Sequence, residues 1–358
     1  MTAIEVDRDA FDRVRTVEER VPEPGAGEAL VRVESFALTA NNITYAVFGD
    51  AMRYWDFFPA AAPWGRIPVW GFGSVVTSDS RDLRVGERLY GYFPMSSHLV
   101  LTPGRADERG VYDTAPHRAG LSGAYNRYAR CAADPVYRAD REDLQMLLFP
   151  LFFTSFVIDD LLGDNDDFGA EQIVISSASS KTALGVAHCA HQRGLRVVGL
   201  TSPGNAALVE SLGVVDEVRR YDDVSSIAPV SSVFVDVAGN ADVRHAVHTH
   251  LADHLAHSMA VGGTHWDQEA AEAGPLPGPE PAFFFAPSQI SKRSKEWGRT
   301  ELDARVGGAW TRFADWAEGW VELRHASGPD AVIAAYQELL AGRADPRHGQ
   351  ICSLAEPA

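Results

Sequence analysis

Glu171-Gln-Ile-Val-Ile-Ser-Ser-Ala-Ser-Ser-Lys-Thr-Ala-Leu-Gly-Val-Ala-His-Cys-Ala-His-Gln-Arg-Gly-Leu-Arg-Val-Val-Gly-Leu-Thr201 is the stretch that decides the fold. Its apolar runs Ile173–Ile175 and Val197–Leu200 are typical of strands buried on both faces. Between these runs, small and apolar residues recur at helical spacing and end at a glycine: Ala183, Val186, Ala187, Ala190 and Gly194. The stretch therefore predicts a strand, a tight turn, a helix and a parallel strand.

Two later segments extend this pattern. Val233–Gly239 is an apolar run that ends in small residues, and Leu255–Gly263 is another that ends in a glycine turn. Strands that alternate with helices imply a parallel sheet covered by helices on both faces. We therefore expect an α/β fold in which the second half of the chain is a doubly wound parallel sheet of the Rossmann type.

The turn of the deciding stretch lacks the glycines of a dinucleotide-binding turn. In such a turn, glycine lets the chain bend sharply and lets phosphate approach the helix N-terminus. Here the turn consists of Ser176, Ser177, Ala178, Ser179 and Ser180. Small side chains are kept, but the backbone freedom of glycine is lost.

Three interpretations of this turn stay open. In the first, hydroxyls and one charge hold a pyrophosphate, and they come from Ser177, Ser179, Ser180, Lys181 and Thr182. In the second, the turn is a kinase-like P-loop, although Ile175 and Ser180 would then replace both of its glycines. In the third, the serines only cap the helix and no cofactor binds.

The first part of the chain is predicted to consist of short strands and turns. Glu28–Glu34 and Pro68–Val76 alternate as half-buried strands do, and Arg84–Tyr92 leads from a turn into a third strand. We expect the apolar segment Leu147–Val157 to open the nucleotide domain as a helix, and Gly349–Cys352 to return as a strand to the first domain. The predicted domains are a β-rich domain over 1–148, completed by 306–358, and a nucleotide-binding domain over 149–305.

The composition is that of an acidic protein of ordinary size. The 358 residues carry a formal net charge of −17, which argues against nucleic acid or an anionic membrane as a partner. Cys131, Cys189 and Cys352 are too few and too far apart for a disulfide framework or a zinc cluster. We recognise neither a signal peptide nor a bilayer span, so we expect a cytoplasmic protein with a small-molecule substrate.

Several motifs carry a family resemblance. Gly27–Val33, Ile67–Val76 and Val85–Gly91 are similar to the GroES-like domain of the medium-chain dehydrogenase/reductase superfamily, and Leu212–Val214 with Tyr221-Asp222 to the run after its second nucleotide-domain strand. The chain most resembles the zinc-free quinone oxidoreductase and enoyl reductase branch. Within it, four motifs resemble a poorly characterised group: Asn41-Asn-Ile-Thr-Tyr-Ala46, Tyr54-Trp-Asp-Phe-Phe-Pro59, Gly91-Tyr-Phe-Pro-Met-Ser96 and Ser176-Ser-Ala-Ser-Ser-Lys-Thr182.

The resemblance implies a GroES-like β-rich domain, a Rossmann domain and a homodimer in which strands near Phe283–Phe285 pair across a twofold axis. It also implies no zinc, because Asn41–Thr44 and Trp70–Gly73 stand where zinc-dependent relatives carry Cys and a His-Glu pair. Five histidines do cluster, namely His245, His248, His250, His254 and His257. Since Leu251 replaces the Glu of a zinc-protease helix, we interpret this cluster as a solvated helix face.

The predicted cofactor is NADP(H). After Leu200, where NAD-specific folds carry an acidic residue, the chain has Thr201-Ser202-Pro-Gly-Asn205, so no carboxylate would repel a 2′-phosphate. Thr154 matches the place where relatives contact the nicotinamide ribose. The complete predicted cofactor set is Thr154, Ser177, Ala178, Ser179, Ser180, Lys181, Thr182, Thr201, Ser202, Asn205, Tyr221, Ala238, Gly239 and Gly262.

The predicted catalytic residues follow from the enoyl reductases, which carry a Tyr shortly after an Asn-containing run. Tyr54 stands near that place after Asn41 and Thr44, and Tyr45 is the second candidate. A phenol there can polarise a carbonyl oxygen or protonate the neighbouring carbon. Three polar residues are further candidates for substrate contact, with a surface ion pair as the alternative: Asp113, Arg118 and Asn126.

Two classes of function stay open. The first is a zinc-independent, NADPH-dependent reductase of an enone, quinone or enoyl thioester that transfers hydride in the cleft between the domains. The second is a redox-silent use of the same fold, as a cofactor-free lyase or hydrolase or as a nucleotide-sensing or binding protein.

Overall fold

The computed structural model describes residues 1–261 and 276–354, which form two compact units. Unit 1 comprises Met1–Pro150 and Val321–Ala358, and unit 2 comprises Leu151–Trp320. The predicted boundary at 305/306 lies fifteen residues before the boundary between the units at 320/321. The helix that contains residues 306–317 belongs to unit 2 because its Phe313 stacks on Phe152, with ring centroids 4.7 Å apart.

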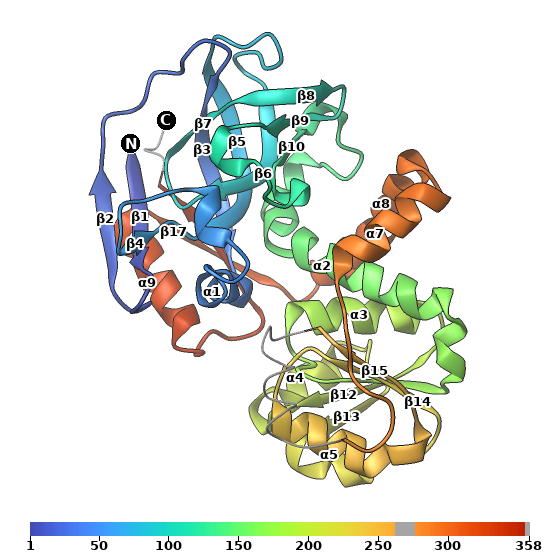
Figure 1. Ribbon diagram of the computed structural model, residues 1–358. Coiled ribbons are helices and arrows are strands. Elements are labelled where there is room, and N and C mark those ends of the chain that lie inside the picture. The colour runs from blue at the N-terminus through green and yellow to red at the C-terminus, as the bar shows by residue number, and fades with distance from the viewer. Residues whose placement is uncertain (262–275, 355–358) are drawn as a thin grey trace. The chain divides into compact units, whose positions relative to one another are not determined.

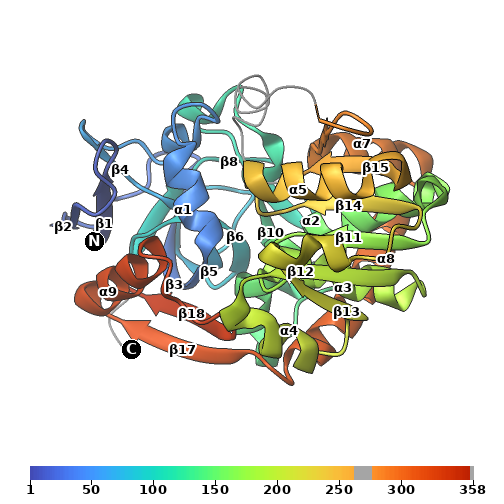
Figure 2. The same ribbon diagram turned by 90° about the horizontal axis from the view of Figure 1, so that it is seen from below.

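Unit 2 is built on a six-stranded parallel sheet with the order β13-β12-β11-β14-β15-β16, and Figure 2 shows its first five strands side by side. The strands are β11 (Gln172–Ile175), β12 (Arg196–Thr201), β13 (Glu217–Arg220), β14 (Ser232–Asp236), β15 (Leu255–Ala260) and β16 (Ala282–Phe283). The helices are α2 (Glu142–Asp164, which begins in unit 1), α3 (Lys181–Gln192), α4 (Ala206–Ser211), α5 (Ala241–Leu251), α7 (Ala286–Glu296) and α8 (Arg299–Ala317).

Successive residues of the central strands face opposite helical layers. Ile173 and Val233 pack with residues of α2, α3 and α8, whereas Val174 and Phe234 pack with residues of α5. Figure 1 shows α3 and α5 on opposite sides of the sheet. Because both faces are covered, the strands read as continuous apolar runs. The predicted doubly wound sheet is confirmed, including the parallel pairing of β11 with β12 and with β14.

Unit 1 is β-rich, as predicted. A nine-stranded sheet has the order β17-β18-β3-β5-β6-β10-β9-β8, with β7 paired to β3, and a three-stranded sheet has the order β2-β1-β4. The strands are β1 (Thr2–Asp7), β2 (Val14–Glu18), β3 (Ala29–Leu38), β4 (Trp64–Gly65), β5 (Pro68–Ser78), β6 (Arg88–Pro94), β7 (His98–Leu101), β8 (Pro103–Asp107), β9 (Gly110–Asp113), β10 (Arg127–Arg130), β17 (Glu322–Ser327) and β18 (His348–Ser353). The described part of the unit also contains the helices α1 (Ala40–Val47) and α9 (Pro329–Leu340).

The C-terminal strand returns to the first unit, as expected. β18 pairs antiparallel with β3, so that Ile351 lies opposite Ala37. Unit 1 also contains β17, which the sequence did not reveal. β17 pairs in parallel with β18, and most of its residues are exposed.

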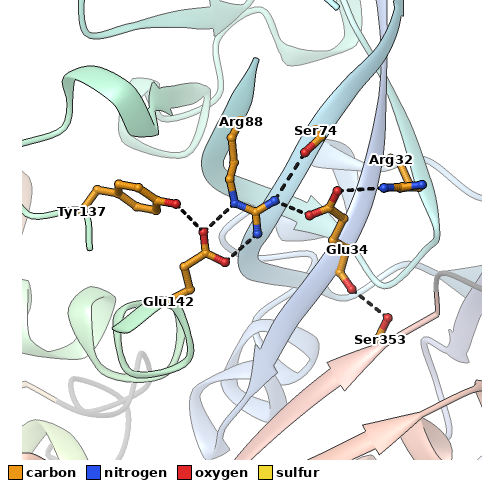
Figure 3. Close-up of polar contacts among 7 residues, drawn as sticks. All are labelled: Arg32, Glu34, Ser74, Arg88, Tyr137, Glu142 and Ser353. Atoms are coloured by element: carbon orange, nitrogen blue, oxygen red, sulfur yellow. Dashed lines mark hydrogen bonds and ion pairs between the residues drawn. The ribbon is translucent and has the colours of Figure 1, made fainter. Parts of the chain in front are cut away.

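An ion-pair cluster joins the start of α2 to the sheet of unit 1 (Figure 3). Arg88 of β6 donates two hydrogen bonds of 2.5 Å to Glu142 in the first turn of α2 and pairs through Nη1 with Glu34 of β3. Tyr137 donates to the same Glu142 carboxylate over 2.8 Å, and Arg32 donates to Glu34 over 3.1 Å. We call Arg88, Glu34 and Glu142 the Arg88 clamp.

α2 corrects one expectation from the sequence. By length and composition alone, the helical stretch Ala139–Asp164 is apolar enough to span a membrane. Half of its most apolar part is, however, buried inside the protein. The C-terminal half of the helix supplies core residues of unit 2, including Val157, Ile158 and Leu162. Burial of this kind explains an apolar helix without a bilayer.

Candidate functional site

The turn after β11 keeps the backbone geometry of a glycine turn without glycine. Ser177 lies in the left-handed region with φ = 54°, which L-residues with a side chain adopt at a cost of roughly 1–2 kcal/mol. Ala178 packs over Gly199 of β12, where an added Cβ would lie 2.9 Å from the Ala178 Cβ atom. Ser180 accepts a hydrogen bond from the Ala183 N–H and so caps α3. We call Ser176–Ser180 the serine turn.

A buried polar network holds the base of the serine turn. Ser176 donates from its hydroxyl to Asp236 at the end of β14 over 2.7 Å and accepts from the Ala238 N–H over 2.9 Å. Asp236 also accepts from the Arg244 Nε over 2.9 Å, and both side chains are almost fully buried. The network ties the turn to the neighbouring strand end. Asp236 and Arg244 were missed by sequence reasoning, although an Asp that ends an apolar strand is a readable signal.

Two more contacts join the serine turn to the segments after β12 and β13. The Ser177 N–H donates to the Tyr221 hydroxyl over 3.1 Å. Asn205 donates from Nδ2 to the Ser179 hydroxyl over 3.0 Å, and the Thr201 hydroxyl lies 3.5 Å from the same oxygen. Burial raises the pKa of Tyr221, so its phenol stays protonated at neutral pH.

The predicted cofactor residues gather at one edge of the sheet. The serine turn, Lys181 and Thr182, the segment Thr201–Asn205, Tyr221, and Ala238 with Gly239 all follow the carboxyl ends of parallel strands or begin the helices after them. Ligands of open α/β sheets bind at this edge. Thr154 lies on α2 and is half-buried, and Gly262 lies outside the described residues.

The donor set of this edge fits a pyrophosphate. It offers the N-terminus of the twelve-residue helix α3, the Lys181 ammonium and several hydroxyls. The segment Thr201–Asn205 at the end of β12 contains no carboxylate, so a 2′-phosphate would meet no repulsion there.

The predicted catalytic tyrosines lie in an aromatic cluster of unit 1. Tyr45 of α1 lies 4.6 Å from Tyr54 between ring centroids, and Tyr92 of β6 lies 4.6 Å from Tyr125. Edge contacts of 5.6 Å between Tyr45 and Tyr92 and of 5.9 Å between Tyr54 and Tyr125 close the group. Trp70 of β5 packs 5.2 Å from Tyr92. We call these five residues the tyrosine cluster.

The phenols of the tyrosine cluster are neutral hydrogen-bond donors. Burial raises the pKa of Tyr45 to about 12, and it raises the pKa values of Tyr54, Tyr92 and Tyr125 as well. Among the described residues, the buried Tyr92 hydroxyl and the Trp70 indole N–H have no hydrogen-bond partner of acceptable geometry. Such groups can donate to a carbonyl oxygen, and none of the phenols is a base at neutral pH.

The other predicted catalytic residues differ in placement. Asn41 is half-buried on α1 and lies close enough to Tyr45 for a side-chain hydrogen bond. Thr44, on the same helix, is exposed. Tyr54 is half-buried whereas Tyr45 is only 5 % exposed, so Tyr54 is the more accessible of the two phenols.

The expectation of a surface ion pair at Asp113 and Arg118 is wrong, because both side chains are 1 % exposed. The Arg118 Nε lies 3.0 Å from the Asp113 carboxylate, and Nη1 donates to Asn126 over 3.3 Å. The guanidinium also lies 4.7 Å from the ring centre of Phe58. Since Arg118 pairs with Asp113 and donates to Asn126 inside the core, the structure gives these three residues a packing role.

The interpretation of the histidines as one solvated helix face is also wrong. His248 is buried, with Nδ1 2.8 Å from the Pro277 carbonyl and Nε2 2.9 Å from the Ser258 hydroxyl. His257 lies on β15 and stacks on Phe168 at 4.0 Å. Of the five clustered histidines, only His245 and His254 are exposed. Within residues 1–261 and 276–354, no three His, Cys, Asp or Glu side chains are placed to hold a metal ion.

The two units together have the architecture of medium-chain dehydrogenases/reductases, a GroES-like domain and a Rossmann domain. CurA from Vibrio vulnificus, solved in complex with NADPH, is similar over the full length of both chains, with a TM-score of 0.65 and 13 % identity. The CurK enoyl reductase matches with a TM-score of 0.57 and 13 % identity over 98 % of each chain. The quinone oxidoreductase from Coxiella burnetii matches with a TM-score of 0.57 and 14 % identity over 99 % of each chain.

Residues 36–345 match the sequence profile of a family described as "Protein of unknown function (DUF2855)", and the chain belongs to this family. No curated protein matches the sequence significantly. The similarity to the solved structures, at 13–14 % identity, concerns the fold.

Proposed function

We propose that the protein is a zinc-independent, NADPH-dependent reductase that acts on a C=C or C=O group of an enone, quinone or enoyl thioester. The observation that carries the proposal is the serine turn, in which Ser177 keeps the left-handed backbone of a glycine turn despite its side chain. Retention of this costly conformation favours a turn selected for a ligand over a turn that only caps a helix. The similarity to proteins that include an NADPH complex supports the same proposal.

NADPH would supply the hydride, and residues of this chain would bind and polarise. Lys181 and the N-terminus of α3 would bind the pyrophosphate, and Tyr221 and Asn205 would bind the adenosine end. In unit 1, Tyr54 would donate a hydrogen bond to the substrate carbonyl oxygen, with Tyr45 as the second candidate. Neutral phenols suit this role because they stabilise developing negative charge on oxygen.

The first test is a titration of the purified protein with NADPH and NADH, followed by the fluorescence of its eight tryptophans. We expect tighter binding of NADPH, because the end of β12 has no carboxylate to repel the 2′-phosphate. A screen of quinones, enones and enoyl thioesters with NADPH would then identify the substrate class. Equal affinity for NADPH and NADH would contradict the assignment of NADPH as the cofactor. If neither nucleotide binds, the proposed reductase activity is contradicted.

A redox-silent protein of the same fold is the second candidate. The hydrogen bonds of the serine turn favour this candidate. The Ser176 hydroxyl, the Ser179 hydroxyl and the Ser177 N–H all bond to other groups of the protein, so a ligand is not needed to satisfy them. Under this proposal the protein is a cofactor-free lyase or hydrolase or a nucleotide sensor. Binding of NADPH without turnover of any substrate in the screen would favour the sensor.

We further propose a homodimer that acts on a small molecule in the cytoplasm. The acidic composition, with a formal net charge of −17, supports a soluble partner over nucleic acid.

A further inference from the structure

A pocket of about 370 Å³ lies in unit 2 at the end of α3 opposite to the serine turn. Its walls come from the last turns of α3, from α8 and from the turn Leu212–Val214 before β13. The helix rises about 1.5 Å per residue, so the ten residues from Lys181 to His191 place the pocket about 15 Å from the start of the helix. The pocket is therefore separate from the predicted cofactor edge.

His188 of α3 lines this pocket and is only 4 % exposed. Its ring packs on two aromatic side chains of α8, 5.4 Å from Phe313 and 5.3 Å from Trp316 between centroids. Among the hydrogen bonds of the described residues, none involves the His188 imidazole. A buried ring with an unused N–H and an unused acceptor at the wall of a pocket is a reason to expect a ligand.

The charge state of His188 is set by its surroundings. Burial, and after it the nearby charges of Arg312 and His191, together lower its pKa to about 4. At neutral pH the imidazole is therefore uncharged and offers one N–H to a ligand oxygen.

Arg312 of α8 supplies the cation of the pocket. It is exposed, and within the described part of the chain it makes no ion pair. Asp315, one turn further along α8, also lines the pocket but has an interaction partner of its own. Arg312 is thus a cation of the pocket that no carboxylate of the described residues pairs with.

The apolar wall of the pocket is flat and fixed. The Trp316 indole donates from Nε1 to the Leu212 carbonyl over 3.1 Å, which holds the ring against the turn before β13. Leu212 and Val214 complete the wall. A planar apolar group can stack on the indole while an anionic group reaches Arg312.

We propose that this pocket binds a small aromatic carboxylate, with the ring against Trp316 and the carboxylate between Arg312 and His188. The site goes beyond the proposed reductase activity and does not depend on it. Its volume admits a single-ring acid, which is smaller than a dinucleotide. Because α3 runs from the serine turn to this pocket, the ligand would contact the far end of the helix that begins at the cofactor edge.

The test is calorimetric titration of the full-length protein with benzoate, and with benzamide and benzylamine as the neutral and cationic counterparts. We expect benzoate to bind in the millimolar range or better, and at least tenfold more tightly than either counterpart. Arg312→Gln should weaken benzoate binding about tenfold, because it removes a charge-assisted hydrogen bond. His188→Phe keeps an aromatic ring against Phe313 and Trp316 but loses the N–H, and should weaken binding about fivefold.

The matched control is Arg299→Gln, an arginine on the same helix that pairs with Asp303 outside the pocket. This variant should bind benzoate as the wild type does. Equal binding of benzoate and benzamide, tighter binding of benzylamine, or equal losses in the Arg299 and Arg312 variants would overturn the proposal. If His188→Phe does not fold, as judged by circular dichroism, the comparison of the two arginine variants decides alone.

Discussion

Ser177 shows how a single residue can preserve the shape of a turn whose usual residue is absent. Its φ of 54° is one that glycine adopts freely, that serine tolerates at a cost and that a β-branched residue resists. We expect Ser177→Val to lower the free energy of unfolding by roughly 2 kcal/mol, since it adds steric strain to the turn. Ser177→Gly, the matched control, should stay within about 1 kcal/mol of the wild type. Urea unfolding of the three proteins measures both changes, and a Val variant as stable as the Gly variant would contradict the strain.

Lys181 tests whether the serine turn binds phosphate. If it does, Lys181→Ala removes a charge-assisted hydrogen bond worth roughly 1.5–3 kcal/mol, so NADPH affinity should fall about ten- to a hundredfold. The half-buried side chain lies in the first turn of α3, so the melting temperature without ligand should change little. Fluorescence titration and a thermal melt of wild type and variant separate the two effects. If Lys181→Ala binds NADPH as tightly as the wild type does, the serine turn does not bind phosphate and only caps α3.

The Arg88 clamp joins three elements, namely β3, β6 and the start of α2 (Figure 3). Arg88→Met leaves two partly buried carboxylates without their common partner, which should lower the free energy of unfolding by about 1–3 kcal/mol at pH 7. The matched control is Arg20→Met, which removes an ion pair whose two side chains are 88 % and 84 % exposed. The control should cost less than about 0.5 kcal/mol.

The pH dependence of this effect follows from Glu34. Burial by itself raises the Glu34 pKa, but hydrogen bonds from Arg88 and Arg32 outweigh burial and hold the pKa below its ordinary value. A carboxyl with a lowered pKa stabilises the folded state above its unfolded pKa, near 4.3, and loses that contribution as pH falls through the folded pKa. The difference in stability between wild type and Arg88→Met should therefore shrink below pH 4. Urea unfolding at pH 7 and pH 3.5 measures it, and a difference independent of pH would exclude an electrostatic origin.

The elements that the sequence predicted are those with a strong periodic pattern. β11, β12 and β14 are buried on both faces, so their apolar runs marked them. β17 was missed because the chain Glu-Leu-Arg-His-Ala-Ser has almost no apolar face and is held by its pairing with β18. The same limit applies to sites. The serine turn was visible as a local motif, whereas the burial of the ion pairs Asp236–Arg244 and Asp113–Arg118 depends on how the elements around them pack.

One edge of the parallel sheet in unit 2 exposes apolar side chains. β16 is the last strand of that sheet; Phe283 in this strand and Phe285 just after it are 44 % and 49 % exposed. An exposed apolar edge favours pairing with another chain, and a second copy would satisfy it with twofold symmetry. We therefore expect a homodimer, which sedimentation at micromolar concentration should detect as twice the chain mass of 38.9 kDa.

Phe283→Asp places a carboxylate in this edge and should shift the sedimenting mass to that of one chain. The fold should survive, because the side chain is already partly exposed and lies at the end of the sheet. Val85→Asp is the matched control, since Val85 is 64 % exposed and belongs to unit 1, not to the sheet of unit 2. This control should leave the mass unchanged, because a surface charge outside an interface has no pairing to break. If the wild type sediments with the mass of one chain, the proposal that this edge mediates self-association is wrong. If Phe283→Asp is still a dimer, the dimer interface does not include this edge.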